Sequence, residues 1–342
     1  MIIRPRKKKK GFFPLLFLIL FLILAGSFFL GLFIYCNTPV EKEGREVVVE
    51  VPGGATLLSA SQLLADSGVI RSVRTFVFLA KLRGRADRIQ AGELRFRTDM
   101  TPLEAMEVLS RGKAVTYQVT IPEGFNVSQV VSVLAARGLG DRDRFSDLAR
   151  DAGFCQSLGV PAGTLEGFLF PDTYSWPKGL SEEEVLSQMV GHFKKVFTDE
   201  MKERAKELDM TELEMVTLAS LIEKETGSPE ERKLVSSVFH NRLRKGYRLQ
   251  TDPSVIYGIE NFDGNLTREH LKKDHPYNTY TRRGLPAGPI ANPGEASLIA
   301  ALYPAQTSFL YFVARGDGTH VFSSTLVEHN EAVRLFQLGG KR

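Results

Sequence analysis

The sequence has few cysteines and little net charge, and each deficit excludes a class of protein. Two cysteines among 342 residues, Cys36 and Cys155, are too few for a disulfide framework or a cysteine-rich zinc module. The formal net charge is only +4, and six of the basic residues lie within the first ten positions. Beyond them the chain has 38 basic against 40 acidic residues. It therefore lacks the basic body of a nucleic-acid-binding protein, and we expect no nucleic-acid partner.

The motifs of several common enzyme classes are also absent. The six histidines form no H-x-x-x-H pair, so the sequence gives no support for a zinc hydrolase, and we expect neither a metal site nor a cofactor. There is no G-x-S-x-G nucleophile elbow and no phosphate-binding glycine loop that ends in Lys-Ser or Lys-Thr. With 43% hydrophobic residues, the chain can still bury the cores of two or three folded units.

A long uncharged run follows the basic N-terminus. No residue from Gly11 to Val40 is charged, and the run is long enough for a spanning helix, which needs ~20 apolar residues. The apolar core of a cleaved signal peptide is usually ~7–15 residues, and no small-x-small cleavage site follows here. The sequence predicts a basic cytoplasmic tail (1–10) and an uncleaved, single-pass anchor (11–36). In a bacterium the chain from about residue 41 onward then lies outside the cytoplasmic (inner) membrane, in the periplasm or its equivalent.

Two segments resemble each other at an offset of seventy residues. The run from Val51 to Gly54 matches the run from Ile121 to Gly124, and each is preceded by a strand-like stretch and followed by an amphipathic helix that ends at glycine. The pattern predicts a LysM-like small α+β subdomain (45–115) and a second small α+β unit (116–162). The alternative for these units is a spacer that does not bind carbohydrate.

The remaining chain (163–342) is predicted to be a mixed α+β domain. Helices are expected from Ser181 to about Glu207, from Thr211, where Glu214 completes a capping box, and from Ser228. The aromatic, turn-rich stretch from Thr164 to Tyr174 has no helical or strand period and is typical of a binding loop. The whole fold class is therefore α+β, behind one transmembrane helix.

Two glutamates near the end of the helix from Thr211 could supply acid–base chemistry. Glu223 follows Ala219 and Ser220 on the helix surface, so a carboxyl there would have room for a substrate beside an apolar surface. Partial loss of hydration would favour the protonated acid that a general acid needs. Glu225 is the rival candidate, and both side chains could instead be structural residues at a helix end.

Several longer motifs occur in one order and carry a resemblance. They are Leu218–Thr226, Val238–Leu243, Leu249–Gly258, Tyr277–Tyr280, Gly284–Gly294, Leu310–Val313 and His329-Asn330, with Glu166–Tyr174 before them. Together they resemble the YceG-like family of endolytic murein transglycosylases (MltG) across roughly residues 41–340.

The resemblance implies a membrane-anchored enzyme that cuts peptidoglycan glycan strands internally, between N-acetylmuramic acid and N-acetylglucosamine, and ends strand elongation. It implies that Glu223 is the one catalytic residue, first as general acid and then as general base, leaving 1,6-anhydro ends. It also implies peptidoglycan synthases as partners. The residues expected to hold sugar hydroxyls and acetamido groups are Asn241, Gln250, Thr251, Asp252, Tyr257, Tyr277, Asn278 and Tyr280.

Two other functions fit the sequence. A lysozyme-type muramidase would use Glu223 together with a second carboxylate, Asp252 or Glu166, and would leave reducing ends. A non-catalytic, anchored peptidoglycan-binding protein would use its two repeated units and would not need Glu223.

Overall fold

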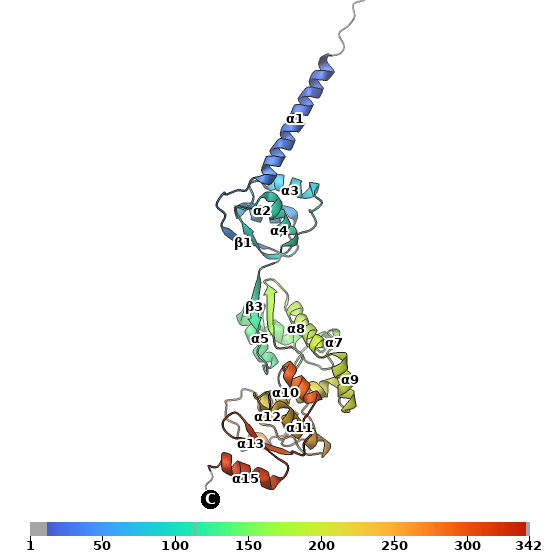
Figure 1. The fold of residues 1–342 in the computed structure, drawn as a ribbon, viewed down its shortest axis with the longest axis vertical. Coiled ribbons are helices and arrows are strands. Elements are labelled where there is room, and N and C mark those ends of the chain that lie inside the picture. The colour runs from blue at the N-terminus through green and yellow to red at the C-terminus, as the bar shows by residue number, and fades with distance from the viewer. Residues whose placement is uncertain (1–11, 113, 340–342) are drawn as a thin grey trace, which may run out of the picture. The chain divides into compact units, whose positions relative to one another are not determined.

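The computed structural model of the chain describes residues 12–112 and 114–339. It is a mixed α+β protein with one long apolar helix near the N-terminus and two compact units, which are described separately (Figure 1). The predicted basic tail (1–10) lies outside the described residues. Unit 1 comprises the chain up to Tyr117 together with Trp176–Gly179, and unit 2 comprises Gln118–Ser175 and the chain from Leu180 onward.

Unit 1 begins with the apolar helix and continues as a small α+β body. Its elements are α1 (Phe12–Asn37), β1 (Glu46–Val51), α2 (Leu57–Asp66), α3 (Val73–Leu82), β2 (Gly92–Arg97) and α4 (Pro102–Arg111). Strands β1 and β2 pair antiparallel from Glu46 opposite Arg97 to Val51 opposite Gly92. The buried faces of the three short helices pack with these strands around Phe76 and Phe96, both fully buried.

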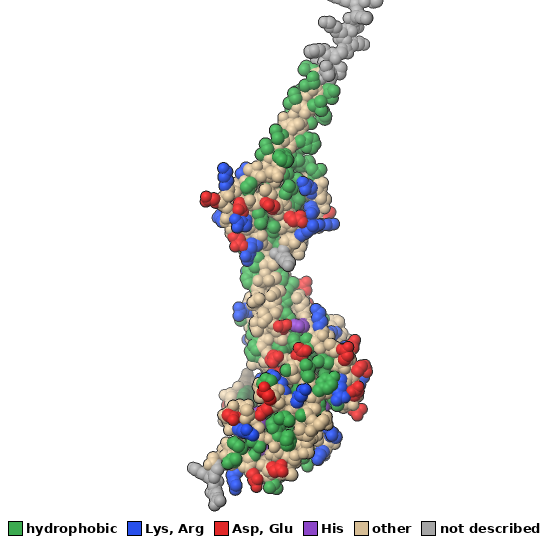
Figure 2. All heavy atoms as spheres, viewed as in Figure 1, with side chains coloured by type: hydrophobic (Ala, Val, Ile, Leu, Met, Phe, Trp, Pro, Cys, Tyr) green, Lys and Arg blue, Asp and Glu red, His purple; other side chains and the backbone are tan. Residues whose placement is uncertain are grey.

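The stretch of α1 from Leu16 to Asn37 is long and apolar enough to cross a membrane, and its side chains are exposed along almost all of its length. Figure 2 shows this hydrophobic surface along the helix. Exposed Phe and Leu side chains in such number are unfavourable in water, and this apolar surface suggests a membrane anchor.

Unit 2 contains most of the helices. They are α5 (Val127–Ala136), α6 (Arg142–Leu148), α7 (Ala152–Ser157), α8 (Glu182–Val196), α9 (Asp199–Glu207), α10 (Glu212–Glu225), α11 (Arg232–Arg244), α12 (Asp252–Tyr257), α13 (Arg268–Lys272), α14 (Glu295–Leu302) and α15 (Leu326–Phe336). A hairpin of β5 (Tyr311–Ala314) and β6 (His320–Ser323) precedes α15. The other strands, β3 (Thr116–Thr120) and β4 (Thr173–Pro177), pair with each other, and the division between the units falls within them.

Helix α10 is the centre of the unit 2 core. Every residue from Met215 to Ile222 is buried, on all sides of the helix, because α10 packs against α11 and α14. Its N-terminus has the expected capping box, in which Thr211 and Glu214 bond each other's backbone N–H groups. A helix that is enclosed in this way holds the side chains of its last turn in fixed positions.

Two helix predictions needed correction. The helix expected from Ser181 to Glu207 is broken at Phe197, because Thr198 caps a new helix, α9. The helix expected from Ser228 begins later, at Arg232. Both repeated segments do contain a strand, a turn with a glycine at positive φ (Gly54 and Gly124) and a helix, but β1 pairs with β2 whereas β3 pairs with β4.

Candidate active site

The two glutamates at the end of α10 point to different sides of the helix. Successive residues of an α-helix are rotated by about 100°, so side chains two positions apart are separated by about 200°. Glu223 and Glu225 therefore meet different neighbours, although both come from the same rigid last turn. The two environments decide which carboxyl is available to a substrate.

Glu223 contacts other parts of the fold. Its Oε2 accepts a hydrogen bond from the backbone N–H of Gly294 at 3.1 Å, and Gly294 is the N-cap residue of α14. Its Oε1 lies 3.9 Å from Nη2 of Arg232, at the start of α11. The side chain is only 7% exposed. These contacts connect α10 to the beginnings of two neighbouring helices, as a structural carboxylate at a helix N-terminus does.

Nearby Glu123 shares this environment. Its carboxylate lies 3.8 Å from Arg232, and burial together with repulsion from Glu223 raises its pKa above the ordinary value. Gly124 has φ +75°, and a Cβ at this position would lie 3.5 Å from Cγ of Glu223. The chain after β3 therefore passes close over Glu223 and covers it.

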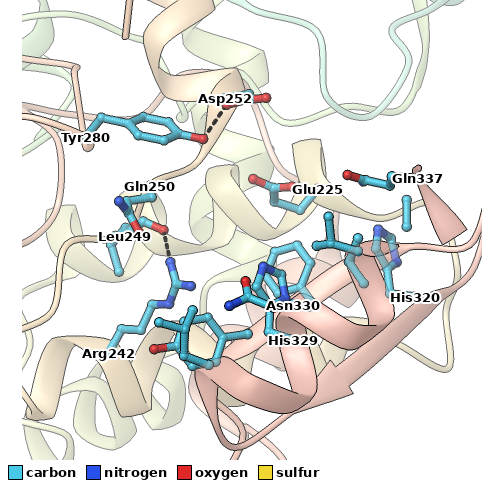
Figure 3. A pocket seen from close by; sticks show the side chains of 16 residues that line it. Glu225, Arg242, Leu249, Gln250, Asp252, Tyr280, His320, His329, Asn330 and Gln337 are labelled. Atoms are coloured by element: carbon cyan, nitrogen blue, oxygen red, sulfur yellow. Dashed lines mark hydrogen bonds between the residues drawn. The ribbon is translucent and has the colours of Figure 1, made fainter. Parts of the chain in front are cut away.

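Glu225 instead lines an open pocket of about 570 Å³ (Figure 3). Burial raises the pKa of its carboxyl above the ordinary value. The hydroxyl of Thr251 and the positive charge of Arg242 act in the opposite direction, and the negative charge of Asp252 raises the pKa further. The net shift is upward, so the protonated form that a general acid requires persists to higher pH in Glu225 than in an ordinary glutamate.

The walls of the pocket come from elements far apart in the sequence. Besides Glu225, the lining residues are Arg242, Leu249, Gln250, Asp252, Tyr280, Tyr311, Phe312, Val313, Ala314, His320, Leu326, His329, Asn330, Val333 and Gln337. In Figure 3 the Glu225 carboxyl lies between the Asp252–Tyr280 pair and the α15 side chains of His329 and Asn330. The mixture of aromatic rings, amides and charged groups is suited to a sugar, which presents both apolar faces and hydroxyls.

Three of the eight predicted substrate-binding residues line this pocket. Asp252 accepts a hydrogen bond from the Tyr280 hydroxyl at 2.6 Å, and burial together with this bond raises the pKa of Tyr280. Gln250 has a left-handed backbone, with φ +51°, and its N–H donates to the carbonyl of Thr279. Leu249 and Asp252, before and after this turn, also line the cavity.

Two other predicted residues use their side-chain amides within the fold, and a third, Thr251, is buried. The Asn278 amide donates to the carbonyls of His270, Leu271 and Lys273 and accepts from the N–H groups of Tyr280 and Thr281. The Asn241 amide donates to the carbonyls of Thr307 and Phe309, both at 2.9 Å. Thr251 is buried at the N-cap position of α12, but its side chain makes no capping hydrogen bond there. None of the three is among the residues that line the pocket.

Tyr257 and Tyr277 lie elsewhere in unit 2. Their rings contact each other at 4.8 Å between centroids, and the Tyr257 hydroxyl donates to Glu166 at 3.0 Å. Glu166 is 5% exposed, and both of its carboxylate oxygens accept from the N–H of Val127, in the first turn of α5. Glu166 and Tyr257 line a separate cavity of about 870 Å³.

Glu166 predicts a dependence of stability on pH. Burial raises its pKa from 4.5 to about 7, so its stabilising contribution is complete below pH 4.5 and is lost as the pH rises through 7. Gln is neutral at every pH, and Glu166→Gln should therefore raise the melting temperature relative to wild type more at pH 8 than at pH 5. Calorimetry at both pH values measures this difference. Exposed Glu260→Gln is the control, and equal effects of Glu166→Gln at the two pH values would contradict the assignment.

Several pocket residues were missed by reasoning from sequence. The Arg242 guanidinium donates to the carbonyls of Leu310 and Leu249, both at 2.6 Å, and lies over the ring of Tyr311. Burial and Arg242 lower the pKa of His329, which keeps this histidine neutral at neutral pH. Arg242, Tyr311 and the His329-Asn330 pair all lie in the motifs quoted above, which was the available signal. Among the described residues, no three His, Cys, Asp or Glu side chains converge to hold a metal ion.

Comparisons with known proteins identify the family. The sequence profile of the YceG-like family matches residues 49–335. An endolytic murein transglycosylase of Bacillus subtilis (strain 168) is 32% identical over 331 residues, which cover 91% of this chain and 90% of that protein. An endolytic murein transglycosylase of Streptococcus pneumoniae (serotype 2, strain D39) is 26% identical, and the match covers 95% of this chain and 65% of that protein.

A solved structure extends the likeness to the fold. The crystal structure of a putative yceG-like protein from Listeria monocytogenes superposes with a TM-score of 0.58 at 32% sequence identity, covering 84% of this chain and 98% of that one. With a family match from Val49 to Leu335 and a relative 32% identical over nearly its full length, this chain belongs to the YceG-like family.

Proposed function

We propose that this chain is an endolytic peptidoglycan transglycosylase that cleaves the bond between N-acetylmuramic acid and N-acetylglucosamine inside glycan strands. The kinship with proteins named endolytic murein transglycosylases supports the activity. The observation that carries the proposal is the pocket in which the carboxyl of Glu225, with a pKa raised by burial, lies among aromatic and polar side chains. Peptidoglycan glycan strands are the substrate, and the synthases that build these strands are the proposed partners.

The proposed reaction uses one carboxyl twice. The protonated acid first donates its proton to the glycosidic oxygen, and the bond from that oxygen to C1 of N-acetylmuramic acid breaks. The resulting carboxylate then removes the proton from the C6 hydroxyl of the same sugar, whose oxygen bonds to C1 and closes a 1,6-anhydro ring. The carboxyl ends protonated as it began, and no water is consumed.

Both Glu223 and Glu225 are candidates for this role, and the geometry favours Glu225. Glu225 faces the cavity, whereas Glu223 accepts a hydrogen bond from Gly294 and is covered by the chain at Gly124. Burial favours the protonated form of Glu225 that the first step needs, and the positive charge of Arg242 favours the carboxylate that exists between the two steps. The role of Glu223 inferred from the resemblance stays a prediction, which the variants in the Discussion test.

A two-carboxylate muramidase is the second candidate function, because Asp252 lines the same pocket as Glu225. A hydrolase needs its second carboxylate as a nucleophile or to activate water. Asp252, however, already accepts a hydrogen bond from Tyr280. Glu166, the other second carboxylate considered, lines the separate cavity beside Tyr257.

Digestion of long, purified glycan strands tests the proposed activity. An endolytic enzyme should shorten strands to fragments of intermediate length early in the reaction, because it cuts at internal bonds. Size-exclusion chromatography over time measures this distribution, with Glu225→Gln as the inactive control. Release of disaccharides alone from strand ends would contradict internal cleavage.

We further propose that α1 anchors the protein in the cytoplasmic membrane, with the N-terminus inside and the glycan-cleaving unit outside. The apolar stretch Leu16–Asn37 supplies the length, and the six basic residues among the first ten favour the cytoplasmic side. A LysM-like, glycan-binding role for residues 45–115 is part of this proposal.

The proposed topology predicts the behaviour of a reporter fused after Arg342. A reporter that is active only outside the cytoplasm should give full signal, because a single span places the two ends of the chain on opposite sides. A second fusion to a reporter that works only in the cytosol is the matched control. Activity of the cytosolic reporter would contradict the topology.

A further inference from the structure

We propose that α3 is an interfacial helix, whose exposed face binds anionic phospholipid headgroups at the outer surface of the membrane that α1 crosses. The proposal rests on the anchoring role of α1 and adds a second, electrostatic contact between unit 1 and the bilayer. Its consequence is that unit 1 would be fixed against the membrane surface.

Helix α1 leads directly into the body of unit 1. Cys36, in the last turn of α1, is 7% exposed and belongs to the unit 1 core, and Leu32 packs against that core. The Tyr35 hydroxyl donates to the backbone carbonyl of Ser72 at 3.1 Å, and Ser72 is the N-cap of α3. The start of α3 is therefore held beside the last turns of the apolar helix.

Helix α3 meets α1 near the outer end of its lipid-exposed part. The rings of Phe28 and Phe78 contact edge to face, with centroids 6.1 Å apart. Helix α1 begins at Phe12, and a hydrocarbon layer of ~30 Å takes up ~20 residues, so a layer counted from Phe12 ends about one turn beyond Phe28. Phe78 then lies close to the lipid–water boundary, where aromatic side chains are favoured.

The exposed face of α3 combines large apolar and cationic side chains. Arg74, Phe78, Lys81 and Leu82 are spaced at four, seven and eight residues, so they share one face of the helix. Phe78 is 46% and Leu82 63% exposed, whereas Phe76 on the opposite side is fully buried. Large apolar side chains beside long cationic ones are the pattern of a helix that lies in a membrane interface.

Positive charge is concentrated in and around α3. Residues 71–88 contain six basic residues and one acidic residue, Asp87. Arg85 pairs with Glu107 at 3.1 Å, but within residues 12–112 and 114–339 no carboxylate pairs with Arg74, Lys81, Arg83 or Arg88. A group of unpaired cations at the membrane boundary is complementary to anionic headgroups.

A groove between α1 and α3 fits a lipid molecule. It has a volume of about 570 Å³ and is lined by apolar side chains, including Phe28, Leu32 and Phe78, with Arg74 beside them. An acyl chain would fill the apolar part and bring its phosphate to the arginine. Because the groove is continuous with the surface of α1, a bilayer that surrounds α1 also reaches the groove.

The test uses the full chain in vesicles of phosphatidylcholine with or without phosphatidylglycerol. Fluorescent labels are placed through Leu82→Cys on α3 and Phe21→Cys on α1, since the native cysteines Cys36 and Cys155 are buried. Glu50→Cys is the control label. Glu50 is exposed and lies opposite Glu93 in the β1–β2 sheet, and the Glu93 carbonyl accepts a hydrogen bond from Val115, where the chain leaves unit 1. Lipids carrying a nitroxide at the headgroup or deep in the acyl chain quench labels at the matching depth.

Quenching of the Leu82 label by headgroup nitroxide, stronger with phosphatidylglycerol, is the expected result, with the Glu50 label unquenched. Removing two charges by Arg74→Gln and Lys81→Gln should lower the ratio of docked to undocked protein about 30-fold. Arg268→Gln with Lys272→Gln, an exposed basic pair on α13, should leave it unchanged.

The outcomes separate docking from anchoring. If the Phe21 label is quenched from within the acyl region but the Leu82 label is not quenched, the anchor stands and the docking proposal is overturned in favour of a protein partner for this face. If the Leu82 label is quenched equally in neutral vesicles, recognition of anionic headgroups is overturned. If the Phe21 label is not quenched, the anchor itself fails and the docking fails with it.

Discussion

Glu225→Gln is expected to lower the rate of glycan cleavage by at least ~10²–10⁴-fold, the range that general acid–base catalysis contributes. The upper part of the range is expected because one carboxyl serves both proton transfers. Gln has nearly the same size and retains a carbonyl oxygen, so the pocket should keep its shape while the transferable proton is lost. Initial rates on purified glycan strands measure the effect.

Glu223→Gln is the matched control on the same helix turn. Its amide oxygen can still accept the hydrogen bond from Gly294, so we expect the fold to be retained and the rate to stay within a few-fold of wild type. Loss of activity at Glu223 with a nearly normal rate for Glu225→Gln would reverse the assignment and restore the prediction made from the resemblance.

The pH dependence should follow the direction of the Glu225 shift. Because burial raises its pKa, the acid stays protonated at higher pH than an ordinary glutamate, and the rate should fall as the pH rises through that pKa. The same shift means that the wild type loses stability as the pH rises. Glu225→Gln should therefore be inactive but, at alkaline pH, more stable than the wild type.

Asn278→Ala should cause the largest loss of stability among the predicted site residues. Asn278 is 1% exposed, and its amide bonds three carbonyls and two N–H groups of the surrounding loop. Leaving buried polar groups unpaired costs about 1–3 kcal/mol each, so we expect a loss of about 3 kcal/mol or more. In a domain of this size that lowers Tm by roughly 6–12 °C.

A pocket variant is the control for Asn278. Gln250→Asn shortens an exposed pocket side chain, and asparagine tolerates the left-handed backbone at this position. It should change KM for glycan strands and leave Tm nearly unchanged. If Asn278→Ala kept the wild-type Tm and raised KM instead, Asn278 would act on substrate and not on the fold.

Local sequence signals predicted the helix that carries the two glutamates but not the other elements that line the pocket. The capping box at Thr211 and the apolar residues after it indicate α10 and place both glutamates in its last turn. Which of them meets a cavity depends on α12, the β5–β6 hairpin and α15, which are distant in the sequence and whose residues line the same cavity as Glu225. The helix period contains no information about these partners.

The polar motif residues show the same difficulty. In the sequence, Asn241 and Asn278 resemble sugar-binding amides. In the structure, the Asn241 amide bonds carbonyls more than sixty residues away, and the Asn278 amide bonds carbonyls of the preceding loop. Such bonds cannot be read from residue type, because an asparagine that holds a loop and one that holds a sugar have the same chemistry. Their proposed contact with substrate stays a prediction.

The central claim is that cleavage proceeds through one carboxyl without water. Digesting glycan strands in water enriched in a heavy oxygen isotope tests this claim, with mass spectrometry of the new ends. The account predicts 1,6-anhydro ends, each lighter by one water than a reducing end and free of the isotope. Reducing ends that carry the heavy oxygen would contradict it and would indicate a hydrolase in which Asp252 acts with Glu225.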